Sequence, residues 1–260
     1  MGVLDGAIPM NPTPDMQAIL HKYRDDGFAV VRRFLDAREH DAIDAAVQHV
    51  TTTVAPSLAI GEVYQEGETT QAIRSMFHLE KHSDFFRDLQ RHARLLTLSR
   101  TLLEDPQAAL GTIMYFGKPA REGSLTPPHQ DNFYQCFVPP EAMRITIAID
   151  ASTADNGPLT CQRGSHQLGV LPHKPSDVLG FSQILAETPD KLRYPEIEIC
   201  LEPGDICVHA TNTVHFSRPN TTDRSRRQLA IECSSTRAQQ DQALLRQRHQ
   251  AVKALHRKKG

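Results

Sequence analysis

PPHQDNFY at residues 127–134, together with VHFSRPN at residues 214–220, is the part of the sequence from which the fold and the chemistry are best predicted. Side chains two apart on a β-strand point to the same face, so His129 and Asp131 would direct an imidazole and a carboxylate at one point. His215 would bring a second imidazole from a distant strand. The two motifs therefore predict three side chains that meet at one metal ion.

Two histidines and one carboxylate on one face of a metal leave its opposite face open, as in the sites of non-haem Fe(II) oxygenases. Arg226 follows His215 by eleven residues, at the start of the next strand with alternating apolar residues. If the two strands are neighbours, the Arg226 guanidinium can bind a carboxylate through two hydrogen bonds, and Ser217 can add a hydroxyl donor. The cosubstrate that such a site implies is a 2-oxo acid whose keto-acid end chelates the metal.

Around both motifs the apolar residues recur with a period of two, which predicts a β-rich core over about residues 110–234. The connection 166–195 contains four prolines and is long for a compact domain; such loops are commonly functional lids or disordered segments. The expected strands are 110–118, 129–137, 143–151, 158–162, 196–200, 206–210, 214–217 and 226–233.

Before this core, about residues 14–105 are expected to form a mainly helical part. Apolar residues at helical spacing begin at Met16 and stop at Gly27, the position of a helix C-terminal glycine. Asp36 with Glu39 has the spacing of a capping box that opens a second helix. The other expectations for this part are a strand at 28–35, a longer helix at 83–103, and irregular chain at 1–14 and 51–80.

The order of these elements predicts the architecture. Helices come first, about eight short strands follow, and a helix at about residues 236–257 comes last. This order favours a mainly β fold with flanking helices around a jelly-roll core. With 260 residues and one such core, the chain is expected to be a single domain, 1–260.

Composition and charge exclude several classes of protein. The 39% apolar and 23% charged residues are typical of a globular protein, and no N-terminal leader or membrane span is expected. A net charge of −2 gives no reason to expect nucleic acid or an anionic membrane as a partner, and the basic residues 257–259 are expected to end a solvated helix. Five cysteines without a Cys-x-x-Cys pair argue against disulfides and a thiolate zinc site, which favours a cytoplasmic protein.

At this point the sequence resembles a known family. HQDNFY, DNGPL, RGSH, HFSRPN and RSRR, with DGFAVVRRFLDAREHDAI and IMYFGKPA nearer the N-terminus, are similar to motifs of the phytanoyl-CoA dioxygenase (PhyH) family of Fe(II)/2-oxoglutarate oxygenases. The resemblance implies a double-stranded β-helix, a cupin-like jelly roll. It also implies that His129, Asp131 and His215 bind iron. Arg226 would bind the C5 carboxylate of 2-oxoglutarate with help from Ser217.

Further residues are candidates for the cosubstrate or the substrate. Lys118 stands at the Lys-x-Pro of the family, close to the expected cosubstrate, and Thr146 is expected at the mouth of the barrel. Arg227 competes with Arg226 but points to the opposite face of its strand. His209 is expected to lie outside the ligand set. The substrate candidates are Asn132, Tyr134, Arg74 and Phe77.

The sequence thus predicts an Fe(II)- and 2-oxoglutarate-dependent dioxygenase that uses O2 and hydroxylates a C–H bond of a small, polar molecule, releasing succinate and CO2. Asp131 counts against a halogenase, in which that ligand is missing. A metal-binding jelly-roll protein without turnover is an alternative, as is an oxygenase for an acyl-CoA or a secondary metabolite. The sequence leaves open the substrate, desaturation as an outcome, and whether the protein is a monomer or a homodimer.

Overall fold

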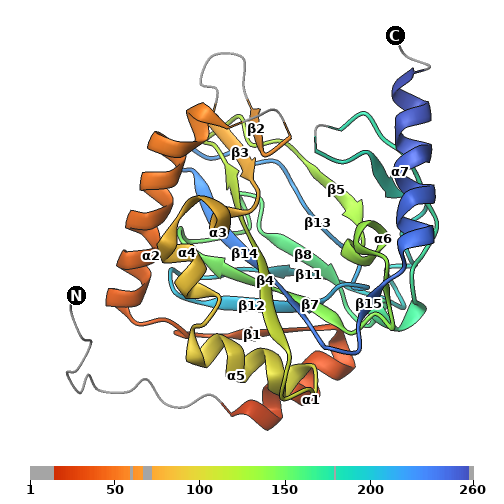
Figure 1. Cartoon of the computed structure of the whole chain (residues 1–260), viewed down its shortest axis with the longest axis horizontal. Helices are drawn as coiled ribbons and strands as arrows, with labels where there is room; N and C mark the ends of the chain where they lie inside the picture. Colours follow the sequence, from red (N-terminus) through yellow and green to blue (C-terminus); the bar gives the residue numbers. More distant parts are fainter. Residues whose placement is uncertain (1–14, 59–60, 67–71, 179, 258–260) are drawn as a thin grey trace.

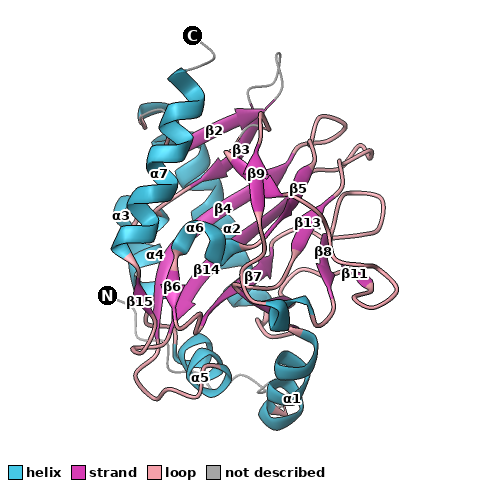
Figure 2. Ribbon diagram, turned by 90° about the vertical axis from the view of Figure 1, so that its right-hand side faces the viewer, coloured by secondary structure: helices cyan, strands magenta, loops and turns pink. Residues whose placement is uncertain are grey.

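Two antiparallel sheets face each other and enclose the centre of the molecule (Figures 1 and 2). The structure, a computed structural model, describes residues 15–58, 61–66, 72–178 and 180–257, so the expected irregular segment 1–14 and the basic Lys258 and Lys259 lie outside it. The large sheet has the order β1 (Phe28–Val31), β12 (Ile206–Ala210), β7 (Ala142–Ala148), β14 (Arg226–Ser234), β4 (Ala109–Lys118), β3 (Ala72–Met76) and β2 (Val63–Glu66). The small sheet has the order β11 (Glu196–Ile199), β8 (Leu159–Gln162), β13 (His215–Ser217) and β5 (Thr126–His129).

These two sheets are those of a jelly roll, so the expected mainly β fold with flanking helices is confirmed. Two further strand pairs lie outside them: β9 (His173–Pro175) with β10 (Gln183–Leu185), and β6 (Phe137–Val138) with β15 (Gln239–Gln240). The helices are α1 (Met16–Asp26), α2 (Ala37–His49), α3 (Leu79–His82), α4 (Asp84–Leu89), α5 (Ala93–Leu102), α6 (Asp131–Gln135) and α7 (Gln242–Arg257), with short turns at Val50–Val54, Ala55–Ser57 and Ser165–Leu168.

The large sheet separates the main hydrophobic core from the cavity between the sheets. Helices cover its outer face, and the small sheet lies on the other side (Figure 2). Because side chains alternate along a strand, odd-numbered residues of β7 and β14 point to the helices and even-numbered residues point to the cavity. In the middle of both strands the outer residues are apolar and fully buried: Ile145, Ile147, Leu229 and Ile231 pack with Ile43 and Val47 of α2 and Leu95 and Leu98 of α5.

The end of α1 and the start of α2 are as the sequence predicts. Gly27 adopts φ +83°, a conformation that glycine takes without strain, and its N–H donates to the carbonyl of Tyr23. At the start of α2, Asp36 accepts from the N–H of Glu39 while the Glu39 carboxylate accepts from the N–H of Asp36. Both caps satisfy backbone groups that a helix end leaves without partners.

The strand expected at 129–137 is wrong. β5 ends at His129, and Asp131 begins the short helix α6. Cys136 ends the helix with φ +56°, and the Asn132 side chain bonds to both backbone groups of Phe137, which favours a turn here. Gln130 between them is still extended, at φ −123° and ψ 131°, so the spacing of two brings His129 and Asp131 together as expected.

The irregular chain expected at 51–80 is also wrong. After α2 the chain continues in helical turns to Ser57. In the first of these turns the hydroxyls of Thr51, Thr52 and Thr53 donate to carbonyls of the preceding turn. Strands β2 and β3 then extend the large sheet through β4. That pairing joins distant segments, and local composition carries no signal for it.

Two helix boundaries differ from the sequence prediction. The helix expected at 83–103 is divided into α4 and α5, because the His92 side chain accepts from the N–H of Leu95 and caps a new helix. The C-terminal helix begins at Gln242 because residues 239–240 pair with 137–138. In the described residues, no helix combines the length and the apolar character needed to cross a membrane.

Candidate metal centre

The two candidate histidines meet because β13 pairs with β5. His215 lies opposite His129 in this pairing, and their ring centroids are 4.2 Å apart. The Nδ1 of His129 lies 2.8 Å from the carbonyl oxygen of Pro127, and that of His215 lies 3.0 Å from the carbonyl oxygen of Thr213. A carbonyl only accepts, so each Nδ1 carries the proton and each Nε2 keeps a free lone pair.

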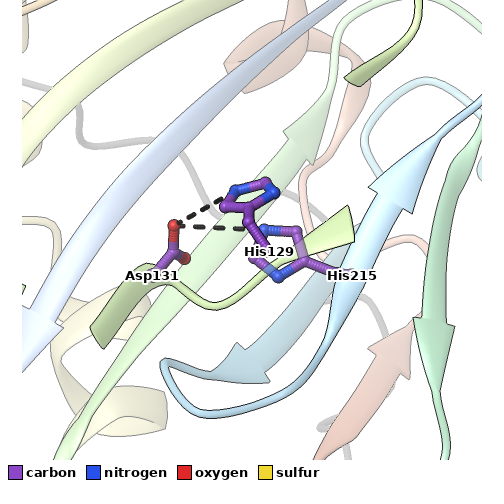
Figure 3. A group of neighbouring side chains, drawn as sticks. All are labelled: His129, Asp131 and His215. Atoms are coloured by element: carbon purple, nitrogen blue, oxygen red, sulfur yellow. Dashed lines mark ion pairs between the residues drawn. The ribbon is translucent and has the colours of Figure 1, made fainter. Parts of the chain in front are cut away.

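Asp131 completes the cluster. Its Oδ1 lies 3.8 Å from Nε2 of His129 and 3.9 Å from Nε2 of His215, as the dashed lines in Figure 3 show. One donor atom from each of the three buried residues lies within 4.8 Å of the others. Imidazole and carboxylate donors in this number suit a non-haem iron.

The protonation states also suit a metal. Burial lowers the pKa of both His129 and His215 below the usual histidine value, which keeps the rings neutral. Burial alone would raise the pKa of the Asp131 carboxyl, but the charge of Arg144 and the nearby histidines hold it well below its usual value. All three side chains are therefore in the deprotonated form that binds a metal.

The second oxygen of Asp131 faces away from the cluster. Its Oδ2 lies 2.9 Å from Nε of Arg144 and 3.2 Å from Nε2 of His209. His209 is thus close to the site but outside the three-residue cluster, as expected. The sequence analysis missed Arg144. Its signal is its place two residues before Thr146, which puts both side chains on the cavity face of β7.

A cavity of about 430 Å³ extends from the metal cluster between the two sheets. Its lining contains most of the candidates from the sequence, namely Arg226, Ser217, Lys118, Thr146, Tyr134, Arg74 and Phe77. Asn132 is an exception: it is buried, and its amide bonds to the backbone of Phe137. Its side chain is therefore used in forming the turn after α6.

One end of the cavity is cationic. Arg226 and Lys118 lie opposite each other on β14 and β4, and they are 3% and 5% exposed. Arg226 donates to the carbonyl of Gly157 over 2.6 Å, but its buried Nε has no hydrogen-bond partner in the described part of the chain. Burial and the nearby Arg226 lower the pKa of Lys118 to about 7. A carboxylate is the natural partner for this pair of cations.

The strands that carry His215 and Arg226 are arranged differently from the expectation that they are neighbours. β13 and β14 are not neighbours; they belong to the small and the large sheet, which face each other across the cavity. His215, Ser217 and Arg226 nevertheless line the same cavity. Spacing along the sequence does not reveal which sheet a strand joins, and here both arrangements bring the side chains to one space.

Residues 180–183 cover the cavity near the metal cluster. The Phe181 ring lies 4.8 Å from that of His129, and the Arg74 guanidinium lies 5.7 Å from the Phe181 ring. Tyr134 donates its hydroxyl to the carbonyl of Gln183. Arg74 also pairs with Glu66 and bonds to Ser124, so its charge is already balanced within the protein.

Known proteins share both the sequence and the fold. A probable alpha-ketoglutarate-dependent hypophosphite dioxygenase of Stutzerimonas stutzeri is 25% identical over 217 residues, covering 81% of this chain and 75% of that protein. A dioxygenase of Epichloe uncinata, lolE1, is 27% identical over 73% of this chain and 70% of its own length. These relatives match most of the chain.

Solved structures show the same fold. EvdO2 of Micromonospora carbonacea var. aurantiaca, complexed with 2-oxoglutarate, has a TM-score of 0.71 and 20% identity, covering 90% of this chain and 96% of that one. The epimerase SnoN in complex with Fe3+, alpha ketoglutarate and nogalamycin RO has a TM-score of 0.68 and 24% identity, covering 86% and 84%. The model of the phytanoyl-CoA dioxygenase (PhyH) family matches residues 23–228, and the chain belongs to this family.

Proposed function

We propose that this iron- and 2-oxoglutarate-dependent dioxygenase hydroxylates a C–H bond of a small polar molecule at Fe(II) held by His129, Asp131 and His215. The observation that carries the proposal is the cluster itself: three donor atoms within 4.8 Å, with both imidazoles held so that Nε2 faces inward. When bound, iron would activate O2 as the oxidant, and 2-oxoglutarate would supply two of the four electrons as it is oxidised to succinate and CO2. The protein's residues bind and orient the reactants.

The cationic end of the cavity supports a place for 2-oxoglutarate. Among the described residues the Arg226 Nε has no hydrogen-bond partner, and Lys118 lies opposite Arg226, so the C5 carboxylate of the cosubstrate could accept hydrogen bonds from both and balance one positive charge. Ser217 is buried and lines the same cavity, where its hydroxyl can donate to that carboxylate. Thr146 lies on the floor of the cavity, between this end and Arg144.

The other end of the cavity supports a polar substrate. Glu232 lies there on β14, opposite Arg144, and accepts a hydrogen bond of 2.7 Å from the Gln135 amide. Polar groups in a partly buried wall favour a ligand that satisfies them. Tyr134 and Phe77 also line the cavity and are the remaining substrate candidates. The S. stutzeri relative is named for hypophosphite, itself a small polar molecule.

We also propose a single domain located in the cytoplasm, acting as a monomer or homodimer without a nucleic-acid or membrane partner. The net charge of −2 supports the absence of a nucleic-acid partner. The alternative is a metal-binding jelly roll without turnover. Succinate release from 2-oxoglutarate in response to one of a panel of small polar molecules would separate the two.

The proposal is tested by adding Fe(II) and 2-oxoglutarate under anaerobic conditions. The wild-type protein is expected to give a weak visible charge-transfer band. His129→Ala and Asp131→Ala should each abolish it, because each removes a ligand. His49→Ala, at an exposed position of α2, is the control and should keep the band. Wild-type absorption in both ligand variants would overturn the assignment.

A further inference from the structure

The two oxygens of Asp131 have different environments. Oδ1 faces Nε2 of both histidines, whereas Oδ2 lies against Arg144 and His209. We propose that Arg144, assisted by His209, is a positioning residue that holds Oδ2 so that Asp131 offers one oxygen to the metal. This inference rests on the proposed function, because it concerns how the iron site is kept in shape.

Arg144 and Asp131 meet on the cavity side of the large sheet. On β7 Arg144 lies between His209 of β12 and Glu232 of β14. Its side chain is 13% exposed, its Nε lies 2.9 Å from Oδ2, and its Nη1 lies 3.3 Å from the Met114 sulfur. The contact with Asp131 is an ion pair without an aligned hydrogen bond, since the Nε–H has no hydrogen-bond partner.

The positive charge of Arg144 is paired with the Asp131 carboxylate. Among the residues that the structure describes, Arg144 forms no ion pair with another acid. A buried guanidinium that lost its carboxylate would remain uncompensated, so the pair resists any movement of Asp131 that pulls Oδ2 away. Arg144 therefore holds the carboxylate at the oxygen that faces away from the histidines.

His209 approaches the same oxygen from the neighbouring strand. It is 1% exposed, its Nε2 lies 3.2 Å from Oδ2, and its Nδ1 has no hydrogen-bond partner. An ionised carboxylate only accepts, so Nε2 of His209 carries a proton and donates it to Oδ2. The His209 ring centroid is 4.5 Å from that of His215. With Oδ2 engaged by both groups, two-oxygen binding of a metal by Asp131 would require breaking these contacts.

Whether removing Arg144 weakens or tightens Fe(II) binding distinguishes a positioning role from a purely electrostatic one. A guanidinium near a metal repels the cation, so charge alone predicts that removing Arg144 tightens Fe(II) binding. Positioning predicts the reverse, because an unheld Asp131 must be ordered when the metal binds. Outer-shell partners of metal ligands typically contribute about 10–100-fold to affinity. The sign of the change therefore separates the two roles.

The experiment measures the Fe(II) dissociation constant by anaerobic calorimetry, without 2-oxoglutarate, for the wild type, Arg144→Met and Arg144→Lys. Arg144→Met should bind Fe(II) about 10–100-fold more weakly, and Arg144→Lys should recover part of the loss. At saturating iron and 2-oxoglutarate, the visible band of Arg144→Met should be shifted, which a general loss of stability would not cause. Arg227→Met is the matched control and should behave as wild type.

Unchanged or tighter Fe(II) binding by Arg144→Met, with an unshifted band, overturns the positioning role. If Arg144→Met does not fold, His209→Phe tests the same oxygen while the guanidinium stays in place: weaker iron binding supports the proposal and wild-type binding overturns it. A wild-type protein that binds neither Fe(II) nor 2-oxoglutarate contradicts the proposed function itself. Normal wild-type binding with no effect of either variant contradicts only the inference about Arg144 and His209.

Discussion

Arg226 and Arg227 are consecutive residues on β14, yet they lie in opposite environments. Arg226 points into the cavity, and among the described residues its hydrogen-bond partner is the carbonyl of Gly157. Arg227 points to the outer face, where it donates to both oxygens of Asp150 and to Asp44 over 2.7–2.9 Å. One arginine has all its charge balanced by the fold, and the other does not.

The pKa shifts of the two guanidinium groups go in opposite directions. Burial lowers the pKa of Arg226 to about 10, so folding disfavours its charge. The hydrogen bonds that Arg227 donates to the Asp150 carboxylate raise the pKa of Arg227 above its ordinary value, so folding favours its charge. A buried cation that costs stability is expected where a ligand needs it. The comparison therefore supports the proposed binding role of Arg226 and predicts a stabilising role for Arg227.

The largest expected effect is on cosubstrate binding. A buried guanidinium–carboxylate pair loses about 2–5 kcal/mol when one partner is truncated. Arg226→Ala should therefore raise the dissociation constant of 2-oxoglutarate by roughly one to three orders of magnitude. Arg226→Lys should recover part of this loss, because an ammonium lacks the planar fork. Calorimetry with iron-loaded protein measures both.

Arg227→Ala is the internal control for this measurement and should bind 2-oxoglutarate nearly as wild type. A loss at Arg227 and not at Arg226 would mean that the two faces have been assigned the wrong way round. If neither substitution weakens binding, 2-oxoglutarate does not use the cationic end, and only the metal site remains.

Lys118 should make the affinity for 2-oxoglutarate depend on pH. With its pKa near 7, the free protein loses the ammonium charge as pH rises, whereas a bound carboxylate favours the charged form. Binding must then take up a proton above pH 7, so affinity for 2-oxoglutarate should fall by about tenfold between pH 6 and pH 8. Calorimetry at saturating iron measures this slope. Lys118→Met should bind more weakly at pH 6 and show a flat profile; an equal slope in that variant would exclude Lys118 as its cause.

The sequence predicts the metal-site residues of the cavity better than the contacts that hold these residues in place. The spacing of His129 and Asp131 indicates the metal site correctly because Gln130 between them is extended. Their side chains therefore point to the same side, as on a strand, even though α6 begins at Asp131. Gln130 is held by long-range bonds to Asn212, Gly169 and Leu171, which no local pattern contains. The site could therefore be predicted while its supports could not.

The same limit explains the residues that were missed. Arg144 was open to prediction from its offset to Thr146, but its partner Asp131 lies on helix α6, and only the folded structure shows that the two side chains meet. The strands β2 and β3, which bring Arg74 to the cavity, depend on pairing with β4. Local sequence sets helix caps such as Asp36 and Glu39 well, because all the interacting atoms lie within one turn.

The smallest expected effect concerns the outer face, through stability. Arg227→Ala removes three side-chain hydrogen bonds to carboxylates at a site where Arg227 is 25% exposed and Asp150 is 21% exposed. Charged hydrogen bonds at a half-buried site justify a loss of about 1–2 kcal/mol in the free energy of unfolding. Asp150 keeps the backbone N–H of residue 227 as a donor, which limits the loss.

Urea denaturation of the metal-free protein measures this loss, and Arg226→Ala provides the matched comparison. Removing Arg226 takes away a charge that folding disfavours, so its substitution should cost less stability than that of Arg227, although it costs far more 2-oxoglutarate affinity. Salt should reduce the difference, since the pair on the outer face is partly open to solvent. If Arg226→Ala proved the more destabilising of the two, the cavity guanidinium would be a structural group, and the division between the two faces of β14 would fail.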